Sequence, residues 1–401
     1  VSKMEELTKK KEICDEYLES RMEELWKVSQ YIHANPELNF EEKKACAVQC
    51  EFLEKYGFQV EKGVGTLDTA YCATFSNDKK GPVIAVVSEY DALPIGHACG
   101  HNLIACTALG TAIEVKKFME ETGISGVLKV IGTPAEEGGG GKIILLDNGV
   151  FDGVDAVFMM HPTSDTTRLA GACLSSKSYK VTYHGISAHA GSHPDNGTNA
   201  LSAAALFLSG SGMLRQHFKA DWRLSGIITK GGFSTGLIPE LTEIEGSMSC
   251  FSLKELNILA ERVKNCALGC GQAMGCKVEI EIEDGYQGRV PNQILSDICK
   301  EEFRQLGEPL MDGMPVDYGG EDLGNVSRRI PICNPYMTIF PEYKISNHTA
   351  QFRELAISEA GYHCIEQASK AMARSIMDVF DDPQIVDKAK EELKERMKKE
   401  A

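Results

Sequence analysis

The chain has 401 residues, of which 43% are hydrophobic and 25% charged, a composition typical of a globular protein long enough for two domains. Its 42 lysines and arginines stand against 58 aspartates and glutamates, a net charge of −16, and no basic cluster interrupts the acidic background. This balance argues against binding to nucleic acid or to an anionic membrane surface. We expect a small-molecule substrate instead.

The 14 cysteines are scattered, no Cys-x-x-Cys occurs, and some, such as Cys46 and Cys50, lie in apolar helical stretches. This distribution favours free thiols in a reducing compartment over a disulfide framework. The N-terminal stretch is charged throughout, without the apolar region of a signal peptide, and no segment is apolar for long enough to cross a membrane. We therefore expect a cytoplasmic protein.

The first part of the chain alternates helical and strand patterns. Residues 5–57 are predicted to form two helices, the second one after the Asn35-Pro36 step. Beyond them, apolar runs predict strands at 82–90, 126–137 and 154–162, with helices at 102–121 and 141–150 between them. This alternation predicts an α/β domain with a mixed, mostly parallel sheet flanked by helices.

From about residue 178 the order of elements changes. A strand, a helix, two strands, a helix and a strand are predicted in turn, at 179–185, 199–218, 222–232, 241–252, 253–275 and 276–284. A β-α-β-β-α-β order is that of the α+β ferredoxin-like unit. We predict an inserted lid and dimerisation domain at 178–289 and a discontinuous, metal-binding catalytic domain at 1–177 and 290–401, which ends in a charged helix or a frayed tail.

Metal-type side chains follow several of the predicted strands, where open α/β sheets build their sites. They are Cys99, His101, Glu136, Glu137, His161 and His348. In an extended segment Cys99 and His101 would point to the same side, whereas adjacent Glu136 and Glu137 would face opposite ways. Taken singly, each has an ordinary structural explanation, as a buried thiol, a surface carboxylate or a core histidine. Together they are a thiolate, carboxylate and imidazole set suited to two zinc, manganese or cobalt ions.

Six motifs, taken in order, extend this pattern. They read HANPELNFEE, SEYDALPIGHACGHN, GTPAEEGGGGK, GISAHAGSHPDNGTNAL, GGEDLGNVS and NHTAQF. From about residue 30 to 375 they resemble the aminoacylase-like metallopeptidase superfamily. Within it, the chain is most similar to the cysteine-containing amidohydrolase branch, which includes hippurate hydrolases, auxin-conjugate hydrolases, p-aminobenzoyl-glutamate hydrolase and β-alanyl-lysine dipeptidase.

The resemblance implies a role for each candidate residue. Two divalent ions, zinc or manganese or else cobalt, would be bound by Cys99, His101, Glu137, His161 and His348. Glu136 would be the general base, and Asp91 would orient the site from behind the ligands. Glu89 stands where some relatives have a metal-binding histidine, whose part the Cys99 and His101 pair would take. His189, in the lid, would reach the active site of the partner subunit in a homodimer.

The implied reaction is hydrolysis of the amide bond of a small N-acyl amino acid or dipeptide. The ions would lower the pKa of a water molecule, and Glu136 would take its proton and return it to the leaving amine. Two departures leave the acyl group and the leaving amino acid open. Gly236 and Ser249 stand where relatives often have asparagine and arginine, groups that bind a carboxylate or an oxyanion.

Three other interpretations compete with this one. A cysteine hydrolase with Cys99 as nucleophile and His101 as base leaves the glutamates and the other histidines without a role. A phosphate-binding loop at EEGGGGKI is rejected, because Glu136 replaces its first glycine and Ile143 its magnesium-binding serine or threonine. A non-catalytic binding protein on the same fold would keep the metal ligands without turnover, and metal analysis with an activity assay separates it from an enzyme.

Overall fold

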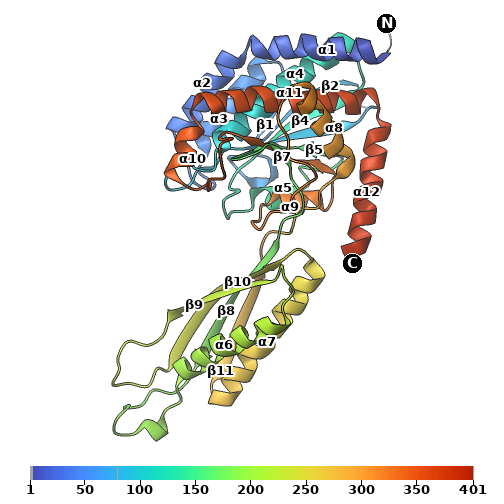
Figure 1. Ribbon diagram of the computed structural model, residues 1–401. Coiled ribbons are helices and arrows are strands. Elements are labelled where there is room, and N and C mark those ends of the chain that lie inside the picture. Colours follow the sequence, from blue (N-terminus) through green and yellow to red (C-terminus); the bar gives the residue numbers. More distant parts are fainter. Residues whose placement is uncertain (1–2, 79, 401) are drawn as a thin grey trace. The chain divides into compact units, whose positions relative to one another are not determined.

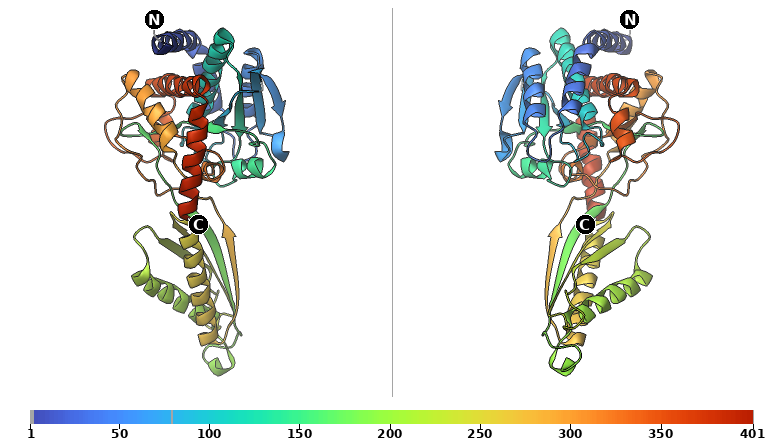
Figure 2. Two further views of the ribbon diagram at one scale, coloured as in Figure 1. Left: turned by 90° about the vertical axis from the view of Figure 1, so that its right-hand side faces the viewer. Right: turned by 90° about the vertical axis from the view of Figure 1, so that its left-hand side faces the viewer.

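The computed structural model describes residues 3–78 and 80–400 and divides into two compact units (Figures 1 and 2). The first unit comprises the described residues up to Ala172 together with Arg289–Asp317 and Glu321–Lys399. The second comprises Cys173–Gly288, Tyr318–Gly320 and Glu400. Each unit has its own buried apolar core, so each can be understood by itself.

The centre of the first unit is a six-stranded sheet. Its order is β1 (Gln59–Lys62), β2 (Tyr71–Asp78), β4 (Gly126–Thr133), β3 (Val83–Glu89), β5 (Ala156–Phe158) and β12 (Ile332–Cys333). β2 pairs antiparallel with β1 and β4, whereas β4, β3, β5 and β12 pair in parallel. The mixed, mostly parallel sheet predicted from the sequence is therefore confirmed.

Helices cover both faces of this sheet, because successive residues of the central strands are apolar. In β3, Ile84 and Val86 belong to one core and Ala85 and Val87 to the other. Continuous burial of this kind is typical of a parallel strand covered on both sides. The first core contains residues of α1 (Lys3–Glu19), α2 (Met22–Ala34), α3 (Lys43–Lys55), α4 (His101–Thr122), α8 (Gln293–Gln305), α10 (Ala350–Leu355) and α11 (Glu359–Asp381), and the second contains residues of α5 (Gly141–Asp147) and α9 (Leu323–Ser327).

Three predicted elements differ from the structure. Residues 5–57 contain three helices, because the chain turns at Ser20 and Arg21 and α1 and α2 then bury separate apolar faces. The predicted strand 154–162 is two strands, since after β5 the chain leaves the first sheet and β6 (His161–Thr163) pairs with β13 (Pro335–Thr338), which also pairs with β7 (Arg168–Leu169). The charged C-terminal stretch is helix α12 (Gln384–Glu400), and buried Val386, Ala389 and Leu393 fix it to the protein.

The second unit is an antiparallel sheet with two helices on one face (Figures 1 and 2). Its elements follow the order β8 (Ser175–His184), α6 (Ala200–Leu214), β9 (Arg223–Lys230), β10 (Leu241–Cys250), α7 (Leu253–Met274) and β11 (Lys277–Asp284). The strand order β11-β8-β10-β9 is that of a split β-α-β-β-α-β unit. Side-chain oxygens of Asn199 and Ser252 cap the starts of α6 and α7, and Phe207 and Val263 bury the helices against the sheet.

Two further features bear on the surroundings of the protein. In the part of the chain that the structure describes, no helix is long and apolar enough to cross a membrane. Each of the 14 cysteines has a free thiol. The core is therefore held by apolar burial and hydrogen bonds without disulfide cross-links.

Candidate metal centre

Cys99 and His101 lie at the start of helix α4, after the loop that leaves β3. Gly100 between them has a left-handed backbone (φ 73°), and a Cβ at this position would lie 2.7 Å from the Pro162 ring. His101 is already the first residue of the helix. The expectation that the pair lies in an extended segment was wrong, because a glycine turn and a helix start bring the two side chains together.

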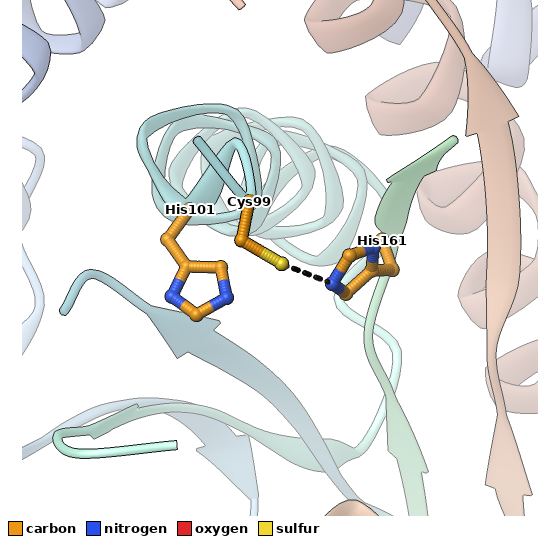
Figure 3. Close-up of side chains that lie close together, drawn as sticks. All are labelled: Cys99, His101 and His161. Carbon is orange, nitrogen blue, oxygen red and sulfur yellow. Dashed lines mark hydrogen bonds between the residues drawn. The ribbon is translucent and has the colours of Figure 1, made fainter. Parts of the chain in front are cut away.

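His161, the first residue of β6, faces this pair (Figure 3). Its Nε2 lies 3.6 Å from Cys99 Sγ, and the three side chains are buried. The other ring nitrogen, Nδ1, lies 2.7 Å from the carbonyl oxygen of Pro162 and must donate a hydrogen to it. The lone pair of His161 Nε2 is therefore directed at the thiol, which is the tautomer that a metal ligand requires.

Asp91, in the loop after β3, orients two of the candidate residues. Its Oδ1 lies 3.1 Å from His101 Nδ1, and its Oδ2 accepts a hydrogen bond of 2.9 Å from the Glu137 backbone N–H. Although burial opposes ionisation, the neighbouring His101 lowers the pKa of Asp91. An ionised Asp91 fixes a hydrogen on His101 Nδ1 and leaves Nε2 free to act as a ligand.

Glu136 and Glu137 lie in a turn two residues past the end of β4, and not on the strand end as expected. Their carboxylates do not face opposite ways, since an oxygen of each lies 3.9 Å from His101 Nε2. Glu137 Oε1 also lies 3.2 Å from His348 Nε2. His348 has a left-handed backbone (φ 61°) and donates its N–H to the Ala98 carbonyl, which ties it to the loop that carries Cys99.

The donor atoms form two sets that share the Cys99 sulfur. The atoms of Cys99, His101 and His161 lie within 4.8 Å of one another, as do those of Cys99, Glu137 and His348. Within the described residues, the buried atoms His101 Nε2 and Glu137 Oε1 have no hydrogen-bond partner. Buried acceptors without donors are costly unless a cation satisfies them. The residues therefore fit two divalent ions bridged by a thiolate.

Burial sets the charge state of the cluster. It raises the pKa of the Cys99 thiol to about 12, and burial together with the Glu89 carboxylate raises the pKa of Glu136 well above its usual value. Burial opposes a charge on His101, but Asp91 and Cys99 outweigh it and raise its pKa well above the usual value. The cluster therefore holds protons that a dication would displace, because metal ligands must be deprotonated.

The sequence reasoning missed a second layer of charged residues. Lys142 in α5 is fully buried, and its Nζ lies 2.5 Å from Glu89 Oε1 and 2.8 Å from Asp322 Oδ1. The motifs GGGGK and GGEDLG contain Lys142 and Asp322, but neither motif indicates a role for these residues by itself. Their significance depends on a contact between residues far apart in the sequence.

A second missed group supports His161. The Tyr336 ring stacks on the His161 ring, with centroids 5.0 Å apart and an interplanar angle of 18°. The Tyr336 hydroxyl donates a hydrogen bond of 3.2 Å to Glu321, which also pairs with Arg289. Stacking and hydrogen bonding together fix the plane of the His161 ring, which sets the direction of its free nitrogen.

His189 belongs to the second unit, whereas the five candidate ligands and Glu136 belong to the first. The side chain is exposed, and its Nδ1 accepts hydrogen bonds of 3.2 Å from Gly191 and 3.0 Å from Ser192 backbone N–H groups. These bonds place the ring hydrogen on Nε2, which points away from its own loop. His189 is thus presented as a donor at the surface of the second unit.

A thiol, imidazoles and carboxylates gathered at loops that follow an α/β sheet, with further carboxylates beside them, define a metal-dependent hydrolase. The comparison with known protein families agrees. The model of peptidase family M20/M25/M40 matches residues 85–371, and the chain belongs to this family. Its activity is that of a metal-dependent peptidase or amidohydrolase.

Known relatives match most of the chain. The Xaa-Arg dipeptidase of Mus musculus is 34% identical over 96% of this chain and 92% of its own length. One of the p-aminobenzoyl-glutamate hydrolase polypeptides of Escherichia coli (strain K12) is 30% identical over 74% of this chain and 65% of its own length. The names of these two relatives indicate two different classes of amide substrate.

Solved structures share the fold. A putative aminohydrolase from methicillin-resistant Staphylococcus aureus has a TM-score of 0.79 at 20% identity, with 91% of this chain and 98% of that chain covered. A dinuclear metal binding peptidase of the M20 family from Bacillus subtilis has a TM-score of 0.74 at 22% identity, with 90% and 99% covered. Both units of the chain thus take part in a fold that solved proteins share.

Proposed function

We propose that this chain binds two divalent ions, zinc or manganese or else cobalt, through one shared thiolate. The ligands are Cys99, His101, Glu137, His161 and His348. The observation that carries this proposal is that two sets of three donor atoms, each within 4.8 Å, share Cys99 Sγ. A sulfur with two lone pairs facing two ions can serve both, as a bridging ligand does in a dinuclear site.

Bound divalent ions supply a water molecule with a lowered pKa and polarise the amide carbonyl. The residues of the chain carry the proton. Glu136 is buried, lies beside the donor set and takes the proton of the attacking water, then delivers it to the departing amine. Asp91 holds both His101 and the turn that bears Glu136 and Glu137, so it positions the ligands and the base together.

Cys99 as a nucleophile is disfavoured. Burial raises the pKa of its thiol to about 12, so that without a cation the sulfur is protonated and unreactive near neutral pH. The Nε2 atom of His161 lies 3.6 Å from this sulfur, and that nitrogen is oriented as a ligand. A chelator is therefore expected to abolish the activity.

We propose dipeptides with a basic C-terminal residue as the substrate class. The similarity to Xaa-Arg dipeptidases extends over 96% of the chain, and a net charge of −16 favours a cationic substrate over the anionic p-aminobenzoyl-glutamate. Ser249 and Gly236 in the second unit supply no charge that would pair with an additional substrate carboxylate.

A hydrolysis panel tests the substrate proposal. The chelator-treated protein is reconstituted with zinc, manganese or cobalt and incubated with arginyl and lysyl dipeptides, neutral dipeptides, N-acyl amino acids and p-aminobenzoyl-glutamate. We expect the highest kcat/KM with a dipeptide that ends in arginine or lysine. A preference for p-aminobenzoyl-glutamate by tenfold or more would contradict the substrate class but not the metal centre.

We propose a homodimer that forms through the second unit, which serves as a lid. β9 is an edge strand, and its Ile227 side chain is 67% exposed. Met213 of α6 is 75% exposed and Phe233, after β9, is 93% exposed. Exposed apolar groups beside an open sheet edge favour association, and two-fold symmetric pairing is the commonest way to cover them.

In this dimer His189 reaches the active site of the partner subunit and donates to the substrate through Nε2. Mixing an inactive Glu136→Gln subunit with an inactive His189→Ala subunit tests the shared site. One site of each mixed dimer then contains both intact residues, so we expect turnover to recover towards a quarter of the wild-type level at full exchange. No recovery after demonstrated subunit exchange would contradict the shared site.

The compartment is a proposal of the same kind. We propose a cytoplasmic protein, because each of the 14 cysteines is a free thiol and the bridging ligand Cys99 must stay reduced to bind metal. Fractionation of the source cells with an antibody tests it, and a fraction outside the cytoplasm would contradict it.

A further inference from the structure

Glu89, the last residue of β3, has a fully buried carboxylate whose two oxygens differ sharply in their surroundings. Oε1 accepts a hydrogen bond of 2.5 Å from Lys142 Nζ. Oε2 has no hydrogen-bond partner within the described residues and lies 3.5 Å from His101 Nε2. A buried carboxylate oxygen with no donor is expensive, so its direction calls for a physical reason.

The contact with His101 is a poor hydrogen bond. Asp91 already takes the hydrogen on His101 Nδ1, so in the neutral ring Nε2 is an acceptor that faces a second acceptor. At 3.5 Å the pair is longer than the usual 2.7–3.2 Å of an N–H···O bond. Two ligands bound at about 2.1 Å to one tetrahedral or octahedral ion stand about 3.0–3.4 Å apart, close to the observed separation.

Other donors converge on the same point. Glu89, His101 and Glu136 offer atoms that lie within 4.8 Å of one another, and all three side chains are buried. His101 also belongs to the set with Cys99 and His161. An ion on His101 Nε2 would therefore have the Glu89 oxygen at its open side, in addition to the ligands already described.

Lys142 and Asp322 hold the Glu89 carboxylate in this orientation. The Lys142 ammonium lies between Glu89 Oε1 and Asp322 Oδ1, and Asp322 Oδ2 accepts a hydrogen bond of 3.0 Å from the Lys142 backbone N–H. The lysine is thus fixed at both its backbone and its side chain. A carboxylate held through one oxygen presents the other with little loss of freedom when an ion binds.

We propose that Glu89 is an additional ligand of the ion bound to His101, and that Lys142 and Asp322 are positioning residues for it. The proposal rests on the dinuclear centre of the proposed function and adds to it a sixth protein ligand. It assigns a direct role to the position that the Cys99 and His101 pair was expected to replace. It also explains why a lysine can be buried beside a cation site, since it neutralises the outer oxygens of two carboxylates.

Two substitutions separate ligation from simple charge. Glu89→Gln keeps the shape but removes the charge, whereas Glu89→Asp keeps the charge but withdraws it by one methylene, so that it cannot reach both Lys142 and the ion. Zinc chloride is titrated into the chelator-treated full chain by calorimetry, with elemental analysis after desalting. We expect both variants to bind one ion at least tenfold more weakly than the wild type, with the other ion nearly unaffected.

Glu114→Gln is the matched control. Glu114 lies in α4, is fully buried and has two carboxylate oxygens without a hydrogen-bond partner among the described residues, but it belongs to no donor set. We expect this variant to bind both ions like the wild type. Wild-type zinc affinity in Glu89→Asp, or an equal loss in Glu114→Gln, would overturn the proposal.

A measurement on the wild-type protein decides the matter if a variant does not fold. Anomalous diffraction from zinc-loaded crystals locates both ions. We expect Glu89 Oε2 within about 2.3 Å of one of them, and a separation above about 3 Å would overturn the inference. Because these readouts measure binding, a protein that binds two ions through Glu89 but hydrolyses nothing would refute the proposed function alone.

Discussion

Replacing Glu136 by glutamine removes a proton acceptor while it keeps the size and shape of the side chain. The residue is only 8% exposed, and its Oε2 lies 3.9 Å from His101 Nε2, so a substitution of equal volume leaves the surrounding donors in place. Metal binding is expected to persist, because the two donor sets that share Cys99 do not include this residue. Proton transfer by a positioned side chain contributes about 10²- to 10⁴-fold to a rate, or about 2.7–5.5 kcal/mol of activation free energy.

The assay compares kcat for an arginine-terminated dipeptide in wild-type and Glu136→Gln proteins reconstituted with the same metal. Metal content is measured on the same samples, so that lost occupancy is not mistaken for lost chemistry. We expect a fall in kcat of at least 100-fold at full occupancy. A variant that carries two ions and turns over at the wild-type rate would refute the role of Glu136 as the base.

Three further substitutions test the surroundings of the centre and the core. Cys99→Ser is expected to lower metal content and rate together, because a serine hydroxyl does not lose its proton to a dication as a thiol does; full occupancy by elemental analysis would show that Cys99 only fills space. Asp91→Asn is expected to weaken zinc binding about 10- to 100-fold, because an amide cannot accept from both His101 and Glu137, and an unchanged affinity would contradict this. Burial, followed by Asp15, raises the pKa of the Glu114 carboxyl well above its usual value, so the folded state retains a proton that the unfolded state loses as pH rises. Stability then falls by about 1.4 kcal/mol per pH unit between the unfolded and folded pKa values. Glu114→Gln is expected to gain melting temperature relative to the wild type from pH 5 to pH 8, and parallel pH profiles of the two proteins would refute this.

The sequence identified the central elements of the first unit because their signals are long and local. Strands β3 and β4 are continuous apolar runs, and α4 is a long helix that lies within a few residues of its predicted bounds. Short strands gave no such signal. β12 has two residues, and β1 alternates too weakly to be recognised, so their places in the sheet depend on partners elsewhere in the chain.

The candidate site shows the same division between local and distant information. Metal-type residues could be found one by one, and the structure gathers Cys99, His101 and His161 within coordination distance. The ion group of Glu89, Lys142 and Asp322 was missed, because its pairs join residues 53 and 180 positions apart and each residue alone reads as an ordinary charge. The left-handed Gly100 was missed as well, so the residues were correctly grouped with the wrong local geometry.

A metal titration of activity tests the central claim most directly. The chelator-treated chain receives increasing equivalents of zinc, manganese or cobalt, and the rate of dipeptide hydrolysis and the bound metal are measured at each step. We expect no activity without metal, a rise with each added equivalent, and saturation at two bound ions per chain. Full activity in the presence of chelator, or saturation without bound metal, would contradict a metal-dependent amidohydrolase built on Cys99 and its neighbours.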